Sequence, residues 1–196
     1  MFSLERFSQA VQLRHETDPE LRLGVCVALC DHWLKIIKRL PDVPSVNRMR
    51  LLAQQMPDVR LHQKQYNFLR DRLGREEARR KVGSPLGLAY EDQTTILRAR
   101  NGMHGIRAKL GADLGEPAAA ATWTLRFPDG NGHAIAGFRG LVSVSRTVHR
   151  ATVHIFDPNI GEYAGELADL DPILTDLFAK IPDYATITEV SRTSEG

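Results

Sequence analysis

Cysteine is scarce in this sequence, and no long hydrophobic run occurs. Two cysteines among 196 residues, Cys26 and Cys30, are too few to build a disulfide scaffold. No apolar stretch approaches the ~20 residues that a membrane-spanning helix needs, so we expect no transmembrane segment. Internal repeats and low-complexity tracts are also lacking. With 42% hydrophobic and 26% charged residues, collagen-like, coiled-coil and wholly disordered proteins are excluded, and a soluble globular protein is indicated.

An excess of charge of one sign is lacking too. Lys and Arg number 26 against 24 Asp and Glu, which gives a net charge of +2. This balance argues against a nucleic-acid-binding protein with a broad basic face. The basic stretch 70–81 is interpreted as a solvated helix face; the sharper alternative is a docking site for an acidic substrate surface or an anionic membrane. No Trp or Phe lies between its charges, so no nucleic-acid partner is expected.

A Sec signal is also absent from the start of the sequence. Residues 1–10 include Glu5 and Arg6 and have no apolar region of the kind that a signal peptide carries. The length of 196 residues corresponds to one domain, or to one domain in two lobes. A chain of this size buries a sizeable core without the help of disulfides or metals.

The first part of the chain has helical periodicity. Apolar residues recur every three or four positions from Cys26 to Leu40, which predicts an amphipathic helix that prolines at 41 and 44 terminate. Ser45 is expected to cap a second helix. The remaining elements predicted in this part are a charged helix over 62–81, a short helix over 91–100 and an irregular glycine-rich segment over 101–117.

Near residue 120 the period becomes two. Trp123, Leu125 and Phe127 alternate with polar residues, which predicts a half-buried strand over 122–127. Further strands are predicted over 133–139, 151–157 and 184–190, with a helix over 167–181. Helices followed by a sheet favour an α+β fold over a βαβ fold. We expect a mainly helical lobe over 1–118 and a mainly β lobe over 119–196.

Cys26 occupies a position that favours a reactive thiol. Gly24 stands just before the predicted helix, so Cys26 falls in its first turn. Unpaired backbone N–H groups and the positive end of the helix dipole favour a thiolate there, and the same N–H groups can stabilise an oxyanion. The alternative is a small buried hydrophobic residue, which is how Cys30 on the same helix is interpreted.

His133 and Asp157 are predicted to pair across two neighbouring strands. If residue 139 faces residue 151 in an antiparallel pair, His133 faces Asp157, and both side chains lie on one face of the sheet. The pair then falls at one end of the sheet, next to turns that admit a substrate. A base and the group that orients it are the expected result.

Three segments together resemble the YopT/AvrPphB-type cysteine proteases, the peptidase C58 group of papain-like folds. Residues 24–33, GVCVALCDHW, resemble the family's nucleophile segment, and residues 132–135, GHAI, resemble its histidine segment. Residues 156–163, FDPNIGEY, are similar to its aspartate segment, FDPNxGE[FY], and are the most specific match. The order Cys, His, Asp along the chain is that of papain-like enzymes.

The resemblance implies a single papain-like α+β domain over 1–196 and a thiol protease. It implies that Cys26 is the nucleophile, that His133 is the general base and acid, and that Asp157 orients His133. A peptide bond would be cleaved through a thioester acyl-enzyme with no metal and no cofactor. The resemblance also implies a secreted bacterial effector or toxin, exported without a Sec signal, that cleaves a protein substrate in the cytoplasm of a target (host) cell.

Two departures from the family pattern leave alternatives open. Papain-like enzymes usually carry an amide side chain five or six residues before the cysteine as an oxyanion donor, where this chain has Leu21 and Glu20. A carboxylate repels an oxyanion, so the backbone N–H of Cys26 is the candidate donor. Only 25 residues precede Cys26, which favours a toxin domain or an effector delivered differently over one with a disordered secretion segment. The alternatives are a glutamine deamidase or transglutaminase toxin using the same three residues, and a catalytically inactive papain-like binding module.

A metal site is not expected near the cysteines. Cys26 and Cys30 share a helix face, but His32 points elsewhere, and no second pair has the spacing of zinc ligands. His154 alternates to the face opposite Asp157, so it is not a rival base. The histidines without an evident partner are His15, His62, His104, His149 and His154.

Overall fold

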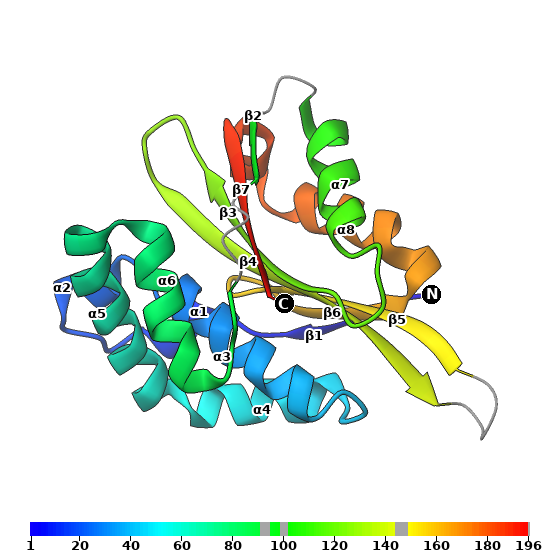
Figure 1. Ribbon diagram of the computed structural model, residues 1–196, viewed down its shortest axis with the longest axis horizontal. Coiled ribbons are helices and arrows are strands. Elements are labelled where there is room, and N and C mark those ends of the chain that lie inside the picture. Colours follow the sequence, from blue (N-terminus) through cyan, green and yellow to red (C-terminus); the bar gives the residue numbers. More distant parts are fainter. Residues whose placement is uncertain (91–94, 99–101, 144–148, 196) are drawn as a thin grey trace.

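The computed structural model describes residues 1–90, 95–98, 102–143 and 149–195. Its centre is a seven-stranded antiparallel sheet in the order β1-β6-β5-β4-β3-β7-β2 (Figure 1). The strands are β1 (Ser3–Arg6), β2 (Thr95–Arg98), β3 (Ala120–Arg126), β4 (Gly132–Ser143), β5 (His149–Asp157), β6 (Gly161–Glu166) and β7 (Glu189–Glu195).

Helices cover both faces of this sheet. Six lie on one side: α1 (Gln9–Gln12), α2 (Pro19–Arg22), α3 (Cys26–Arg39), α4 (Ser45–Gln54), α5 (Met56–Leu73) and α6 (Arg75–Gly83). The other side carries α7 (Gly102–Asp113) and α8 (Leu170–Lys180), as Figure 1 shows. Short 3-10 helices are Ser84–Leu86, Leu167–Asp169 and Pro182–Thr186.

The alternation of side chains along the strands divides the core into two layers. In β4, Ala134 and Ala136 pack with α3, whereas Ile135 packs with α8. In β5, Phe156 faces α3, and its ring stacks on that of Trp33 with centroids 5.4 Å apart. The central strands are therefore buried on both faces, and the nucleophile helix predicted from the sequence is the one that packs directly on the sheet.

Several predicted elements are confirmed, and others are wrong at their boundaries. The helix from Cys26 is α3 and ends at Arg39. Ser45 begins α4 but does not cap it, because Pro44 is the N-cap and the Ser45 hydroxyl donates to Glu162 instead. The predicted helix over 62–81 is two helices, since Gly74 separates α5 from α6.

The secondary structure predicted from the sequence is wrong between residues 91 and 117 and again near residue 184. Residues 101–117 contain the helix α7, which its buried Ile106 and Leu110 hold against the sheet despite its glycines. Thr95–Arg98 is a strand paired with β7, not a helix; the rest of the predicted 91–100 helix lies outside the described residues. The predicted strand 184–190 begins instead as the 3-10 helix Pro182–Thr186, and β7 starts only at Glu189.

The N-terminal strand β1 was not expected from the sequence. It pairs with β6, so the first residues of the chain complete the sheet edge beside the FDPNIGEY segment. The division into lobes over 1–118 and 119–196 stays a prediction. Across the described ranges, no helix has the length and apolar character to cross a membrane.

Candidate active site

Cys26 is the first residue of α3, with a partly exposed side chain. Two of the neighbouring backbone N–H groups are capped by glutamine side chains: Val25 donates to Gln9 Oε1 at 3.1 Å, and Ala28 donates to Gln63 Oε1 at 3.2 Å. The N–H groups of Cys26 and Val27 have no hydrogen-bond partner in the part of the chain that the structure describes. These two donors at the helix N-terminus suit an oxyanion beside the thiol.

His133 and Asp157 do pair, although their strands are in a different register. His133 Nε2 lies 3.1 Å from Asp157 Oδ1, and both residues are buried. The strands align Arg139 with Val153 rather than with residue 151, a shift of two positions from the predicted register. A shift of two keeps every side chain on its face, so the pair survives as a diagonal contact.

Asp157 is held by two further donors that fix its carboxylate. The backbone N–H of Asn159 donates to Oδ1 at 2.7 Å, and the hydroxyl of Tyr184 donates to Oδ2. The Tyr184 ring also lies 6.0 Å from the His133 ring, centroid to centroid. Tyr184 is therefore part of the site, and sequence reasoning missed it because it was assigned to a strand.

The electrostatics of the site favour a thiolate–imidazolium pair. Burial alone would raise the pKa of the Cys26 thiol, but the hydrogen bond and charge of His133, with the Ala134 backbone, lower it overall. Burial alone would lower the pKa of His133, but the charge and hydrogen bond of Asp157, together with Cys26, raise it to about 10. Since Nε2 contacts Asp157, Nδ1 is the nitrogen left for Cys26.

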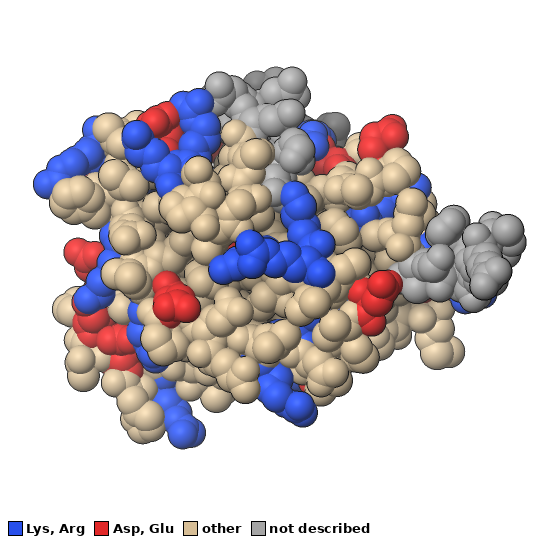
Figure 2. Space-filling view, turned by 60° about the horizontal axis from the view of Figure 1, so that its bottom comes forward, with Lys and Arg blue, Asp and Glu red and all other residues tan. Residues whose placement is uncertain are grey.

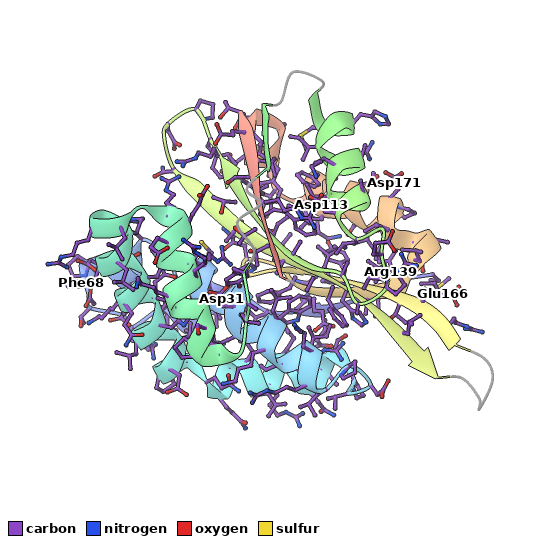
Figure 3. All side chains as sticks on the ribbon, in the orientation of Figure 1. Asp31, Phe68, Asp113, Arg139, Glu166 and Asp171 are labelled. Atoms are coloured by element: carbon purple, nitrogen blue, oxygen red, sulfur yellow. The ribbon has the colours of Figure 1, made fainter. Side chains whose placement is uncertain are left out.

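A buried ionic cluster supports α3, the helix that begins with Cys26. Asp31 Oδ2 lies 3.0 Å from His62 Nε2, and Arg79 donates to Asp31 Oδ1 at 2.6 Å (Figure 3 labels Asp31). Tyr90 donates to the same oxygen. Arg79 thus corrects the interpretation of 70–81 as a wholly solvated face, because it is buried and its charge helps to lower the pKa of Cys26. His62, for which the sequence offered no partner, belongs to the same cluster.

A second buried cluster centres on Glu162. Its carboxylate accepts hydrogen bonds from Trp33 Nε1 at 3.0 Å, from Ser45 Oγ at 2.9 Å and from the Arg48 guanidinium. His154 Nδ1 lies 3.0 Å from Glu162 Oε1, so His154 also has a partner, on the face opposite Asp157. Burial would raise the pKa of Glu162, but His154 and Arg48 lower it to about 2.

The thiol opens into a cleft of about 1560 Å³. Its walls come from the start of α2, the link between α2 and α3, the start of α3, the second half of α5, parts of α6 and the turn between β3 and β4. Cys26, Gly24 and His133 line it, together with Gln63, a buried amide that the sequence did not point to. Glu20 lines the cleft, whereas Leu21 is buried in the core, so neither supplies an amide beside the thiol.

The other cysteine lies away from solvent. Cys30 is fully buried in the core, and burial raises the pKa of its thiol well above the usual value. His32 contacts Gln55, not the cysteines. Within the described ranges there is no group of three or more His, Cys, Asp or Glu residues that would hold a metal ion.

The fold is that of a known bacterial protein. The structure superposes on the crystal structure of the Pseudomonas avirulence protein AvrPphB with a TM-score of 0.72 and 18% sequence identity, over 99% of this chain and 97% of that chain. It is also similar to PatoxP, a cysteine protease-like domain of the Photorhabdus asymbiotica toxin PaTox, with a TM-score of 0.48 and 10% identity over 98% of this chain and 53% of that one. No protein-family profile and no curated protein matches the sequence. The α+β papain-like fold and the resemblance to the YopT/AvrPphB type are thus confirmed at the level of the fold by AvrPphB.

Proposed function

We propose that this protein is a cysteine protease of the YopT-like effector or toxin type. The observation that carries the proposal is that Cys26 and His133, from a helix N-terminus and a strand, line one cleft, and that buried Asp157 pairs with His133 from the neighbouring strand. The lowered pKa of Cys26 and the raised pKa of His133 support an activated thiolate at neutral pH.

In the proposed reaction, the Cys26 thiolate attacks the carbonyl carbon of a peptide bond. The tetrahedral oxyanion is held by the backbone N–H groups of Cys26 and Val27. His133 gives its proton to the leaving amine, and the carbonyl carbon stays on sulfur as a thioester. His133 then takes a proton from water, which attacks the thioester and releases the acid. Asp157 keeps the imidazole in place and stabilises its charged form throughout.

The size of the cleft supports a protein substrate. Small-molecule sites usually measure about 300–1,000 Å³, and this cleft, at about 1560 Å³, is larger. Its length along α5 suits an extended polypeptide segment. The likeness to an avirulence protein supports action on a protein in the cytoplasm of a target cell.

The experiment is a search for new chain termini in a eukaryotic cell extract. The extract is incubated with the protein, and newly formed N-termini are labelled and identified by mass spectrometry. We expect a small set of cleavage sites that Cys26→Ala and His133→Ala both abolish. The same spectra separate the alternatives: a mass increase of 1 Da at glutamine without a cut identifies a deamidase, and crosslinked products identify a transglutaminase. An extract unchanged in every respect would leave the inactive binding module as the function.

A further inference from the structure

The wall of the cleft that α5 and α6 form is lined by cations. Lys and Arg side chains gather at the left end of the molecule in Figure 2, which is the end that α5 and α6 form in Figure 1. The basic residues that line the cleft itself are Lys64, Arg70, Arg72, Arg75 and Lys81. The acidic residues that line it are Asp18, Glu20 and Asp71.

Most of these charges are already neutralised within the protein. Lys64 pairs with Asp18 at 2.5 Å, and Arg70 pairs with Asp71 at 2.9 Å. Lys81 lies 3.5 Å from Glu77 on its own helix. In the described part of the chain, Arg72 and Arg75 have no carboxylate partner, and both are exposed. The charge that remains on this wall is therefore two guanidinium groups.

Arg72 is held in position by an aromatic platform. Its guanidinium carbon lies 3.4 Å from the centroid of the Phe68 ring, and that ring is 57% exposed (Figure 3). Because the Phe68 ring is largely exposed, it contributes little to the hydrophobic core. Its face attracts the Arg72 guanidinium and limits the motion of that side chain. A guanidinium stacked in this way keeps its N–H edges open for a carboxylate.

Arg75 occupies a position that helix energetics do not favour. It is the first residue of α6, where the positive end of the helix dipole repels a cation. The two glutamates that follow it are the residues that suit that end of the helix. Arg72, by contrast, lies in the last turn of α5, where the dipole accepts a cation. The helix dipole therefore favours an arginine at position 72, whereas it gives no reason for an arginine at position 75.

An acidic side chain of α2, the helix beside α5, also lines the cleft. Glu20 lies near Lys64 but forms no salt bridge among the described residues. A polypeptide that spans the cleft therefore meets a negative group at α2 and two positive groups at the junction of α5 and α6. These charges favour a bound segment whose acidic residues lie beside the two arginines and not beside Glu20.

We infer that the substrate is a protein segment whose acidic side chains bind Arg72 and Arg75 at the α5–α6 end of the cleft. The inference rests on the proposed function and adds its substrate class. Leu23, which is 92% exposed, lines the cleft three residues before Cys26 and offers an apolar contact to the part of the segment nearer the thiol. The expected segment is thus apolar near the thiol and acidic toward α5 and α6.

The test measures binding and does not depend on hydrolysis. Fluorescein-labelled synthetic peptides that share an apolar sequence and differ only in three Glu, three Gln or three Lys residues are titrated with the Cys26→Ala protein, and anisotropy is recorded. We expect the Glu peptide to bind about tenfold more tightly than the Gln peptide, as two exposed ion pairs allow. We expect Arg72→Gln/Arg75→Gln to remove this preference.

A matched control separates local recognition from net charge. Arg14→Gln/Arg150→Gln removes two exposed cations that do not line the cleft, and it should keep the preference for the Glu peptide. Equal affinity for the three peptides, no binding of the Glu peptide, or an equal loss in both double variants would overturn the inference. So would binding to phosphatidylserine vesicles that depends on Arg72 and Arg75 without any preference among the peptides. A Glu peptide that binds but is never cut by the native protein counts against the proposed function alone.

Discussion

Trp33 Nε1 donates a hydrogen bond to Glu162 Oε2 at a distance of 3.0 Å, and both side chains are fully buried. Trp33 belongs to the segment that carries Cys26, and Glu162 belongs to the segment that carries Asp157. The two segments that most strongly suggested a protease family are therefore in direct contact through residues with no chemical role. Their bond holds α3 against β6, next to β5, the strand that ends in Asp157.

Cys26 should be alkylated at a pH well below that of an ordinary thiol. Because His133, whose own pKa is raised to about 10, lowers the pKa of the Cys26 thiol, Cys26 carries more thiolate at a given pH than an ordinary thiol does. Iodoacetamide labelling from pH 5 to 9, read by peptide mass spectrometry, measures this. In His133→Ala the labelling of Cys26 should shift upward, toward or beyond the ~8.5 of a free thiol. Buried Cys30 serves as the internal reference and should stay unlabelled; a Cys26 profile that ignores His133 would contradict the pairing.

Asp157→Asn should impair catalysis strongly and leave the fold intact. The amide still occupies the buried site but no longer stabilises the charged imidazole, so we expect kcat to fall by about 10²–10⁴. Tyr184→Phe removes the hydrogen bond from the tyrosine hydroxyl to the Asp157 carboxylate, whereas the contact between Asp157 and His133 remains. We expect Tyr184→Phe to lower the free energy of unfolding by about 1–3 kcal/mol and to reduce kcat far less than Asp157→Asn does. The measurements are kcat on a cleaved peptide and urea unfolding; an Asp157→Asn variant as fast as the native protein would refute its role.

Glu162 should make stability depend on pH in the acid range. Its pKa is about 2 in the folded protein against a usual 4.5, so its contribution is present above pH 4.5 and is lost as the pH falls toward 2. A difference of this size corresponds to about 3 kcal/mol. Urea unfolding followed by tryptophan fluorescence across this range measures the loss.

The acid dependence has a matched control on the same strand. Glu162→Gln should remove the dependence and destabilise the protein by about 3–5 kcal/mol, because Arg48 is left buried without its partner. Glu166→Gln changes an exposed carboxylate at the end of β6 and should leave the curve as it is. If the native and Glu162→Gln proteins lost stability in parallel below pH 4.5, another group would be responsible.

Gly161→Ala should disrupt the turn that presents Asp157. Gly161 has a φ of +129°, and an added Cβ would lie 2.0 Å from the carbonyl oxygen of Glu5 in β1. The substitution therefore forces β1 away from β6, and we expect a loss of more than about 2 kcal/mol. Gly130→Ala is the control, since Gly130 has a φ of +82° but nothing within 4 Å of an added Cβ. Equal losses in the two variants, measured by thermal unfolding, would show that backbone strain alone matters.

The papain-like fold class and the pairing of His133 with Asp157 were predicted from the sequence more accurately than the bounds of several elements around them. Alternation along a strand is enough to place His133 and Asp157 on one face, and it tolerates an error of two positions in register. The first turn of α3 follows from the apolar period and from Gly24. None of this depends on which distant segments meet, which is why the sequence alone is enough to propose Cys26, His133 and Asp157 as candidates.

Contacts between distant segments could not be predicted, because periodicity along the chain does not show which segments meet. The partner of Asp31 is an arginine 48 residues away in a stretch that looks like a charged surface helix, and only tertiary packing turns Arg79 inward. Tyr184 approaches Asp157 from a short 3-10 helix that has no periodic signal. The helix α7 is glycine-rich, and only the sheet beneath it accounts for its conformation.

The pairing of the edge strand β1 with β6 makes the proposed activity depend on a contact between distant parts of the chain. Ser3 in β1 and Ala164 in β6 are paired although 161 positions separate them in sequence. Closing so long a loop is slow relative to forming the helices, because its entropic cost is met before the pairing offers any gain. During synthesis, a chain that already contains β1, Cys26 and His133 still lacks Asp157 and β6, the strand with which β1 pairs. The proposed activity should therefore be absent from nascent or partly refolded molecules and should appear only once β6 has paired with β1.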